Sequence, residues 1–155
     1  MPKIIIFVFA TSRVKVRRAG EGDISVLMAF AEEFMHEAAT REERLAILKS
    51  YLNDADYELW VAEVNGEMAG FIDLWIIHDF CHGGKLGYIQ NLYVAPKHRR
   101  MGVGSKLLRK IVERARELRA LEIHVVTEFN NESAIRLYKK HGLTKESLQL
   151  EMEFE

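Results

Sequence analysis

The spacing of apolar residues along the chain predicts a regular series of strands and helices. Thr40 and Glu43 stand at the spacing of a capping box, so a helix is expected to begin after Thr40. Asn65-Gly66, between two apolar stretches, is typical of a two-residue hairpin turn. The expected elements are, in order, a strand at 14–18, helices opening near 23 and 40, strands at 58–64, 67–77 and 86–94, a helix at 103–119, a strand at 122–127, a helix at 131–141 and a strand at 148–154.

This order places one strand–helix–strand crossover within a series of antiparallel strands. A crossover of this kind joins two parallel strands, whereas a hairpin joins two antiparallel ones. The expected fold is therefore of the α/β (α+β) class, with a mixed, mostly antiparallel sheet and helices on both of its faces.

The first residues stand apart from this pattern. Ile4 to Ala10 form an uncharged apolar run at the lower limit of length for a secretory signal, and the residues after it make a poor cleavage site. We therefore expect an extra strand or an extension at 1–13, paired or buried if it is ordered, and one domain at 14–155.

Composition narrows the classes of function. The chain has 155 residues, which is about the size of one domain. Its 22 Lys and Arg nearly balance its 23 Asp and Glu, and a net charge of −1 argues against a dedicated nucleic-acid binder. The single cysteine, Cys81, excludes a disulfide scaffold and a cysteine-rich zinc site. With no apolar stretch long enough to span a membrane, the expectation is a cytoplasmic domain.

A basic loop with two glycines connects the expected strand ending at Val94 to the expected helix beginning at Val103. Amide groups at a helix N-terminus have no intrahelical partner and lie at the positive end of the helix dipole. Gly102 and Gly104 allow the backbone to approach an anion closely, which indicates a phosphate or pyrophosphate cradle. Positive charge is added by Lys97, His98, Arg99 and Arg100. The spacing fits neither a P-loop nor a dinucleotide fingerprint, and a simple tight turn is the alternative.

Two sequence blocks carry a resemblance to a known family. Residues 99–104 (RRMGVG) match the Arg/Gln-x-x-Gly-x-Gly/Ala loop of the GCN5-related N-acetyltransferases, the GNAT superfamily. Residues 131–143 (NESAIRLYKKHGL) resemble the family's N-x-x-A-x-x-L-Y-x-x-x-G-F signature and depart from it only at Leu143, where phenylalanine is usual. Residues 90–96 (QNLYVAP) are also similar to the family pattern, and the element order agrees from about 14 to 155.

The resemblance implies a sheet in which two central parallel strands splay apart around acetyl-CoA, the co-substrate. It implies that the pyrophosphate lies on the loop, that the pantetheine arm pairs with a strand, that Asn131 contacts the cofactor and that Tyr138 lies near its sulfur. The cofactor-binding residues expected in this way are Leu92, Tyr93, Val94, Arg99, Arg100, Met101, Gly102, Val103, Gly104, Ser105, Asn131 and Tyr138. No metal is expected.

Acetyl transfer to an amine requires a neutral amine, a donor for the developing oxyanion and a proton for the leaving thiolate. By resemblance, the donor is the backbone amide of Val94. The phenol of Tyr138 is the expected general acid, although its helical spacing also suits packing alone. The base stays open, because Gln90 and Asn91 occupy the strand on which family members often place a glutamate. The candidates are Glu32, Glu33, Asp73, His78 and a water relay.

The sequence therefore predicts an N-acetyltransferase that passes the acetyl group of acetyl-CoA directly to a primary amine of a small molecule or protein. One alternative is a non-catalytic acyl-CoA-binding sensor or interaction module, and another is a nucleotide-phosphate binder. His78, Cys81 and His82 crowd one turn but are too few for a closed zinc shell. The terminal strands also suggest a homodimer, and the amine acceptor is not specified by any motif.

Overall fold

The computed structural model describes residues 13–35 and 39–154. The expected element at 1–13 therefore lies outside the described residues, apart from Arg13. The six strands of the single sheet are β1 (Val14–Arg18), β2 (Tyr57–Val64), β3 (Glu67–Asp79), β4 (Gly84–Ile89), β5 (Leu92–Val94) and β6 (Ala120–Val125). Their order is β1-β2-β3-β4-β6, with β5 also paired to β3. Only β4 and β6 are parallel, so the mixed, mostly antiparallel sheet is confirmed.

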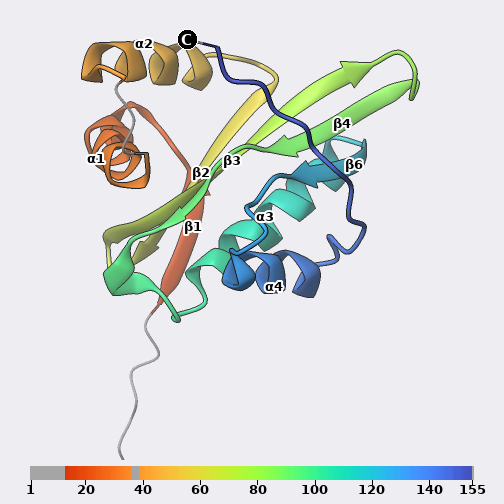
Figure 1. Ribbon diagram of the computed structural model, residues 1–155. Coiled ribbons are helices and arrows are strands. Elements are labelled where there is room, and N and C mark those ends of the chain that lie inside the picture. The colour runs from red at the N-terminus through yellow and green to blue at the C-terminus, as the bar shows by residue number, and fades with distance from the viewer. Residues whose placement is uncertain (1–12, 36–38, 155) are drawn as a thin grey trace, which may run out of the picture.

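Helices cover both faces of this sheet (Figure 1). One face carries the short 3-10 helix η1 (Glu21–Asp23) with α1 (Ile24–Phe34) and α2 (Arg41–Leu52). The other carries α3 (Val103–Glu117) and α4 (Glu132–Lys140). A second 3-10 turn, η2 (Pro96–His98), leads from β5 toward α3. The crossover from β4 through α3 to β6 is the one that the sequence predicts.

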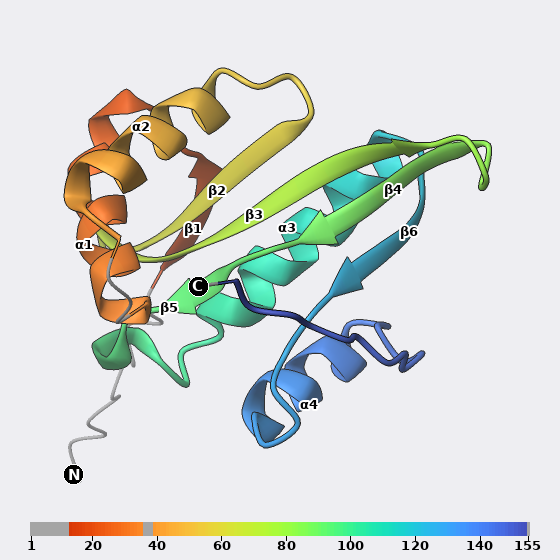
Figure 2. The same cartoon turned by 45° about the horizontal axis from the view of Figure 1, so that its top comes forward.

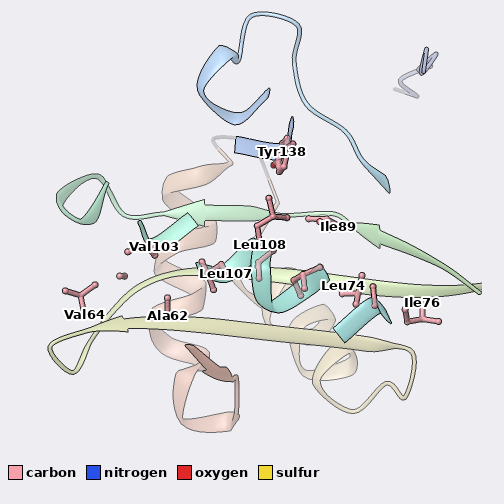
Figure 3. Close-up of a cluster of buried hydrophobic side chains, with 13 residues drawn as sticks. Ala62, Val64, Leu74, Ile76, Ile89, Val103, Leu107, Leu108 and Tyr138 are labelled. Atoms are coloured by element: carbon pink, nitrogen blue, oxygen red, sulfur yellow. The ribbon is translucent and has the colours of Figure 1, made fainter. Parts of the chain in front are cut away.

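The main hydrophobic core lies between the sheet and α3 (Figure 3). Helix α3 supplies side chains that are completely or almost completely buried, at the positions where its apolar spacing meets the sheet. The cluster comprises Ala62, Val64, Ala69, Ile72, Leu74, Ile76, Ile89, Val103, Leu107, Leu108, Ile111, Ala115 and Tyr138. Ile72, Leu74 and Ile76 from the centre of β3 belong to this core. The core therefore holds in place β3 and the two strands paired with it near the candidate site, β4 and β5.

The opposite face has a smaller and more aromatic core. Leu27 and Phe30 of α1 pack there against Phe71 and Tyr93 from the sheet. Helix α2 has no fully buried side chain and adds only partly buried residues such as Tyr51. This face is therefore held together less tightly than the face that carries α3.

The local signals for caps and turns are confirmed. The side chain of Thr40 accepts a hydrogen bond from Glu43 N at 3.2 Å, and Thr40 N donates to the Glu43 carboxylate at 2.8 Å. Asn65 and Gly66 both have positive φ angles, 51° and 82°, as the hairpin turn between β2 and β3 requires. Asp23 precedes α1 without capping it, because its carboxylate binds Gly20 N and Arg17 instead.

Two strand predictions need correction. The strand expected at 86–94 is two strands, because the chain breaks at Gln90 and Asn91 between β4 and β5. The strand expected at 148–154 is wrong for the single chain, since those residues pair with no other strand in the described part of the chain. An alternating pattern shows that a segment can form a strand, but the strand itself requires a partner.

Candidate active site

The candidate site begins at the free edge of β5. Ala95 N donates to Ala69 O at 2.8 Å, and Asp73 N donates to Asn91 O at 3.1 Å. Residues that bond across an antiparallel pair alternate with residues that do not. The backbone groups of Leu92 and Val94 therefore point away from β3. Beyond the pair formed by Ile89 and Val125, the chain after β4 and the chain after β6 run apart, as Figure 2 shows.

The buried carboxylate of Asp73 on β3 binds both residues of the break between β4 and β5. One oxygen of Asp73 accepts from the backbone amides of Gln90 and Asn91, at 2.9 and 2.7 Å. The other accepts from the Asn91 side chain at 2.8 Å and from the Tyr57 hydroxyl at 3.1 Å. The side chain is 1% exposed, and burial raises the pKa of Asp73, although the four hydrogen bonds oppose that rise. Asp73 thus ties both residues of the break to the centre of the sheet.

The loop after β5 ends in a row of free amides at the start of α3. Gly102 has a φ of 78° and is the N-cap of α3, and Arg100 also has a positive φ of 60°. Lys106 N donates to Gly102 O at 3.1 Å, so the amides of Val103, Gly104 and Ser105 precede the first intrahelical bond. No Cβ clash explains Gly102, since a Cβ there would meet nothing within 4 Å. The left-handed backbone is what requires this glycine.

At Gly104, close packing around the Cβ position is what favours glycine. A Cβ at this position would lie 3.2 Å from a methyl group of Leu137 on α4 and 3.7 Å from a methyl group of Val94 on β5. The start of α3 is therefore packed directly between the free strand edge and α4. The two sequence blocks that resemble the GNAT family meet at this point.

The four basic residues of the loop have different partners in the structure. Lys97 forms an ion pair with Glu67, and the buried His98 ring lies 3.6 Å from the same carboxylate. Arg99 instead turns toward the candidate site, where its Nε donates to the carbonyl of Val94 at 3.1 Å. Arg100 is exposed and lies closest in sequence to Gly102.

A serine–histidine contact joins the cradle to the end of α4. Ser105 Oγ lies 2.6 Å from Nε2 of His141, the C-cap residue of α4. Burial lowers the pKa of His141, and the positive charges of Arg109 and Lys140 lower it further. Where the ring is neutral and its Nε2 carries no proton, that nitrogen can accept a hydrogen bond from the Ser105 hydroxyl. The sequence analysis does not predict His141 as a candidate site residue, because nothing in the linear pattern indicates a contact with Ser105.

The two residues expected on α4 occupy different environments. Asn131 caps the helix, and its side-chain oxygen accepts from Ala134 N at 3.2 Å. Tyr138 is 8% exposed and lies beside Leu108 and Ile89 in the core cluster (Figure 3). Burial raises the pKa of Tyr138, so its phenol stays protonated at neutral pH. Ile89, which belongs to the same cluster as Tyr138, is the last β4 residue before the break and forms the last pair with β6.

Two of the four candidate bases lie near β5. Glu33 of α1 accepts a 2.5 Å hydrogen bond from the hydroxyl of Tyr93, the residue between the two free-edge residues. Burial and this carboxylate raise the pKa of Tyr93 to about 12. Asp73 is adjacent but fully engaged by its four donors. Glu32 instead pairs with Arg41 at 2.5 Å, and His78 lies 3.3 Å from Asp56 in the distal part of β3.

The turn between β3 and β4 does not form a metal site in the described residues. Cys81 is exposed, and its backbone N donates to the Asp79 carboxylate, which also pairs with His82. No group of three His, Cys, Asp or Glu side chains with metal-binding geometry occurs among residues 13–35 and 39–154. In the same part of the chain, no helix is both long and apolar enough to cross a bilayer.

Comparisons with known proteins agree with this architecture. Rat (Rattus norvegicus) N-acetyltransferase 8 is 31% identical over 99 residues, which cover 64% of this chain and 45% of that protein. The uncharacterized N-acetyltransferase YhfO of Bacillus subtilis is 27% identical over 137 residues, covering 86% of this chain and 92% of its own length. The chain thus spans less than half of the rat relative and nearly all of the bacterial one.

The solved structures give the same fold. The aminoglycoside N-acetyltransferase AAC(6')-Iy, in a complex with CoA, superposes with a TM-score of 0.79 at 17% identity, covering 93% of this chain and 95% of that chain. The sequence model of the acetyltransferase (GNAT) family matches residues 24–143, which include the loop, both strands at the break and α4. With the fold, the loop and the α4 block all in agreement, the chain belongs to the GNAT family of acetyltransferases.

Proposed function

We propose that residues 14–155 form an N-acetyltransferase domain that transfers the acetyl group of acetyl-CoA directly to a primary amine. The observation that carries this proposal is the convergence of three features at one place. They are the free backbone edge of Leu92 and Val94, the unpaired amides at the start of α3, and Tyr138 at the strand break.

The residues present suit a pantetheine-linked pyrophosphate. Arg100 and Gly102 both have left-handed backbone, a conformation that occurs where successive backbone amides form an anion-binding concavity. The proposed cradle comprises Arg99, Arg100, Met101, Gly102, Val103, Gly104 and Ser105. Within the expected segment Leu92, Tyr93 and Val94, the backbone groups of Leu92 and Val94 would hold the pantetheine arm by strand-like pairing, while Tyr93 pairs with Phe71 of β3. Asn131 would contact the cofactor from the start of α4.

The bound co-substrate supplies an activated thioester. In our proposal Val94 N–H donates to the thioester oxygen as negative charge develops on it. The Tyr138 hydroxyl gives its proton to the departing sulfur, which its raised pKa permits because the phenol is protonated beforehand. Arg99, held on the Val94 carbonyl, keeps the strand edge in position.

The amine must lose its proton before it attacks, and the structure favours the α1 side for its approach. Glu33 and the Tyr93 hydroxyl form a polar pair beside β5 on that face. Either Glu33 or a water beside it would accept the proton. A direct transfer needs no enzyme thiol, and the exposed Cys81 lies in a turn far along β3 from the break.

A Tyr138→Phe variant tests the central assignment. The acid role predicts transfer slowed by about 10²-fold or more with CoA affinity nearly unchanged, because the ring still packs in the core. The measurement is single-turnover release of CoA thiol from acetyl-CoA with an amine that the wild type uses. Equal loss of binding and transfer, or no loss of either, would assign Tyr138 to packing alone.

The alternative of a non-catalytic acyl-CoA sensor has one feature in its favour, the amides Gln90 and Asn91 on the central strand. A panel of amines separates the two proposals, since a sensor binds acetyl-CoA but releases no thiol with any of them. The panel should include free amino acids, polyamines, aminoglycosides, lysine peptides and peptide N-termini. The acceptor is proposed only as a primary amine of a small molecule or protein, and the location only as cytoplasmic.

A further inference from the structure

A row of aromatic side chains crosses the α1 face of the sheet. Trp75 of β3 packs into the aromatic core of that face and is paired with Tyr88 of β4, which is paired in turn with His124 of β6. The rings of Tyr88 and His124 are stacked, with 4.7 Å between their centroids and 14° between their planes. At the other end, the ring of Trp75 lies 4.8 Å from the rings of both Tyr51 and Tyr57. We call these five residues the aromatic band.

The polar atoms of three rings in the band have no partner. The chain has five Tyr and two Trp, and three of these seven side chains donate to a carboxylate. They are Tyr57, Trp60 and Tyr93. The hydroxyls of Tyr51 and Tyr88 and the indole N–H of Trp75 have no hydrogen-bond partner within residues 13–35 and 39–154, and none of them is buried. These half-buried rings therefore offer both an aromatic surface and free polar groups to a ligand.

The aromatic band lies next to the proposed reaction centre. Ile89 follows Tyr88 in the chain and belongs to the core cluster that contains Tyr138. Asp73, which binds both residues of the break, also accepts a hydrogen bond from Tyr57 of the band. Figure 2 shows α1 and α2 over the β1–β3 side of the sheet, with β4 and β6 extending beyond them. A ligand that reaches the break across this part of the sheet therefore passes over the band.

The charges around the aromatic band suit an aromatic ring better than a polycation. Asp73 already accepts from four donors, and Glu122 lies 3.1 Å from Nε2 of His124. Both cation–π contacts in the described part of the chain involve Trp60 on the other face, so no Lys or Arg covers a ring of the band there. Uncovered rings can stack with another ring, whereas a polycationic amine would need several unpaired carboxylates.

We propose that the acceptor is a primary amine carried on a short chain by an aromatic ring, and that the aromatic band binds this ring. The inference rests on the proposed function, because the break is the place proposed for acetyl transfer. Trp75 and Tyr88 stack with the ring, and the amine points toward the break, where Glu33 and the Tyr93 hydroxyl lie beside β5. Trp75 and Tyr88 then determine specificity, since they select the amine without moving the acetyl group.

Two amines of nearly the same size test this selectivity. Phenylethylamine and cyclohexylethylamine have the same chain, but only the first carries an aromatic ring. We expect kcat/KM to be about tenfold higher for phenylethylamine, which is the gain that stacking of this kind supplies. Spermidine, a polycation, should be a poorer acceptor than both. Release of CoA thiol from acetyl-CoA measures each rate.

Variants of the aromatic band should change this preference. Trp75→Leu and Tyr88→Leu should each bring the ratio of kcat/KM for the two amines close to one, because leucine is apolar but cannot stack. The ratio compares two substrates of one protein, so a partial loss of folded enzyme does not affect it. Phe80→Leu is the matched control. Phe80 is 93% exposed in the turn after β3, outside the band, and its variant should keep the wild-type ratio.

Tryptophan fluorescence gives a second readout that needs no turnover. Trp60→Phe leaves Trp75 as the only tryptophan, because the chain has two. With CoA bound to this variant, phenylethylamine should change the emission of Trp75 at about a tenth of the concentration that cyclohexylethylamine requires. Equal concentrations for the two amines, or no change in emission with either, would overturn the assignment of the ring to the band.

The outcomes separate this inference from the proposed function. Thiol release with several amines but no preference for the phenyl over the cyclohexyl compound would overturn the aromatic acceptor and leave the acetyltransferase standing. A preference that persists unchanged in both Trp75→Leu and Tyr88→Leu would show that the ring binds elsewhere and would overturn the role of the band. Absence of thiol release with every amine would overturn the proposed function and this inference together.

Discussion

The two faces of the sheet are built on different principles. On the α3 face, a continuous apolar cluster reaches from β2 to Tyr138, and the helix that starts at the phosphate cradle is completely buried along one side. On the α1 face, the core is smaller and aromatic, and α2 buries no side chain fully. The first face carries both sequence blocks of the family, whereas the second carries neither.

Under the proposed function, this difference corresponds to what each face would recognise. A cofactor shared by a whole family can be held by backbone amides and a rigid helix start, which need few particular side chains but a fixed geometry. An acceptor that differs between members is contacted by side chains on less tightly packed elements. If the two faces are independent, a substitution on the α1 face should leave CoA binding unchanged unless the residue also contacts the break between β4 and β5.

Asp73 is on the α1 side of the sheet, yet it binds the backbone amides of both residues of the break that precedes the proposed cofactor edge. Asp73→Ala would leave the amides of Gln90 and Asn91 and the hydroxyl of Tyr57 without their acceptor. We expect a loss of about 3–5 kcal/mol in the free energy of unfolding, because unsatisfied buried donors are costly. Urea denaturation measures it.

Tyr57→Phe is the matched control for this variant, because it removes only one of the four hydrogen bonds to Asp73. Its expected cost is about 1 kcal/mol. CoA affinity should fall in Asp73→Ala and stay nearly unchanged in Tyr57→Phe. Equal, small losses of stability in both variants would mean that the break persists without the carboxylate.

Gly102→Ala tests the cofactor face alone. With a φ of 78° at this position, an alanine costs about 1–2 kcal/mol in the backbone conformation that the cradle needs. We expect CoA affinity to weaken about tenfold, since 1.4 kcal/mol corresponds to a factor of ten. Calorimetric titration with CoA measures it. Gly22→Ala, at a glycine with open space and no positive φ, should bind CoA as the wild type does.

The family fold and the position of the cradle could be predicted from the sequence because their signals are local. The capping box at Thr40, the turn at Asn65-Gly66 and the loop at 99–104 each lie within a few residues. The break at Gln90 and Asn91 could not be predicted, because those residues continue a strand-like pattern. Its cause is a carboxylate that lies 17 residues away from Gln90 in sequence.

The partners of the basic residues in the loop could not be predicted from the sequence either. Four consecutive basic residues predict a phosphate-binding cluster, but Glu67 on β3 engages two of them from outside the cradle. The sequence places His141 only at the end of an expected helix, whereas its contact with Ser105 depends on how α4 packs beside α3. Both outcomes are decided by tertiary contacts that a linear pattern does not contain.

Thr40→Ala tests the α1 face. Loss of the N-cap should destabilise α2 locally by about 1 kcal/mol, since α2 has little buried surface to compensate. Hydrogen exchange of the α2 amides should quicken while the exchange of α3 amides and the affinity for CoA do not change. A weaker CoA affinity in this variant would show that the two faces are coupled more tightly than the packing indicates.

The smallest expected effect is a pH dependence that His141 gives to the cofactor face. Its folded-state pKa lies below the ordinary value near 6.5, so between those two pKa values the unfolded chain binds more protons than the folded chain. Stability should therefore decrease as the pH falls below about 6.5, and His141→Gln should remove that part of the decrease.

The affinity for CoA should instead increase as the pH falls, because a phosphate group beside Ser105 favours the protonated His141 ring. Calorimetric titrations at about pH 7.5 and about pH 5.5 should then show a gain in affinity at the lower pH that is larger in the wild type than in His141→Gln. An identical pH dependence of CoA affinity in the two proteins would place the phosphates away from Ser105. A phosphate bound beside Ser105 would have to raise the pKa of the His141 ring, which contacts that serine.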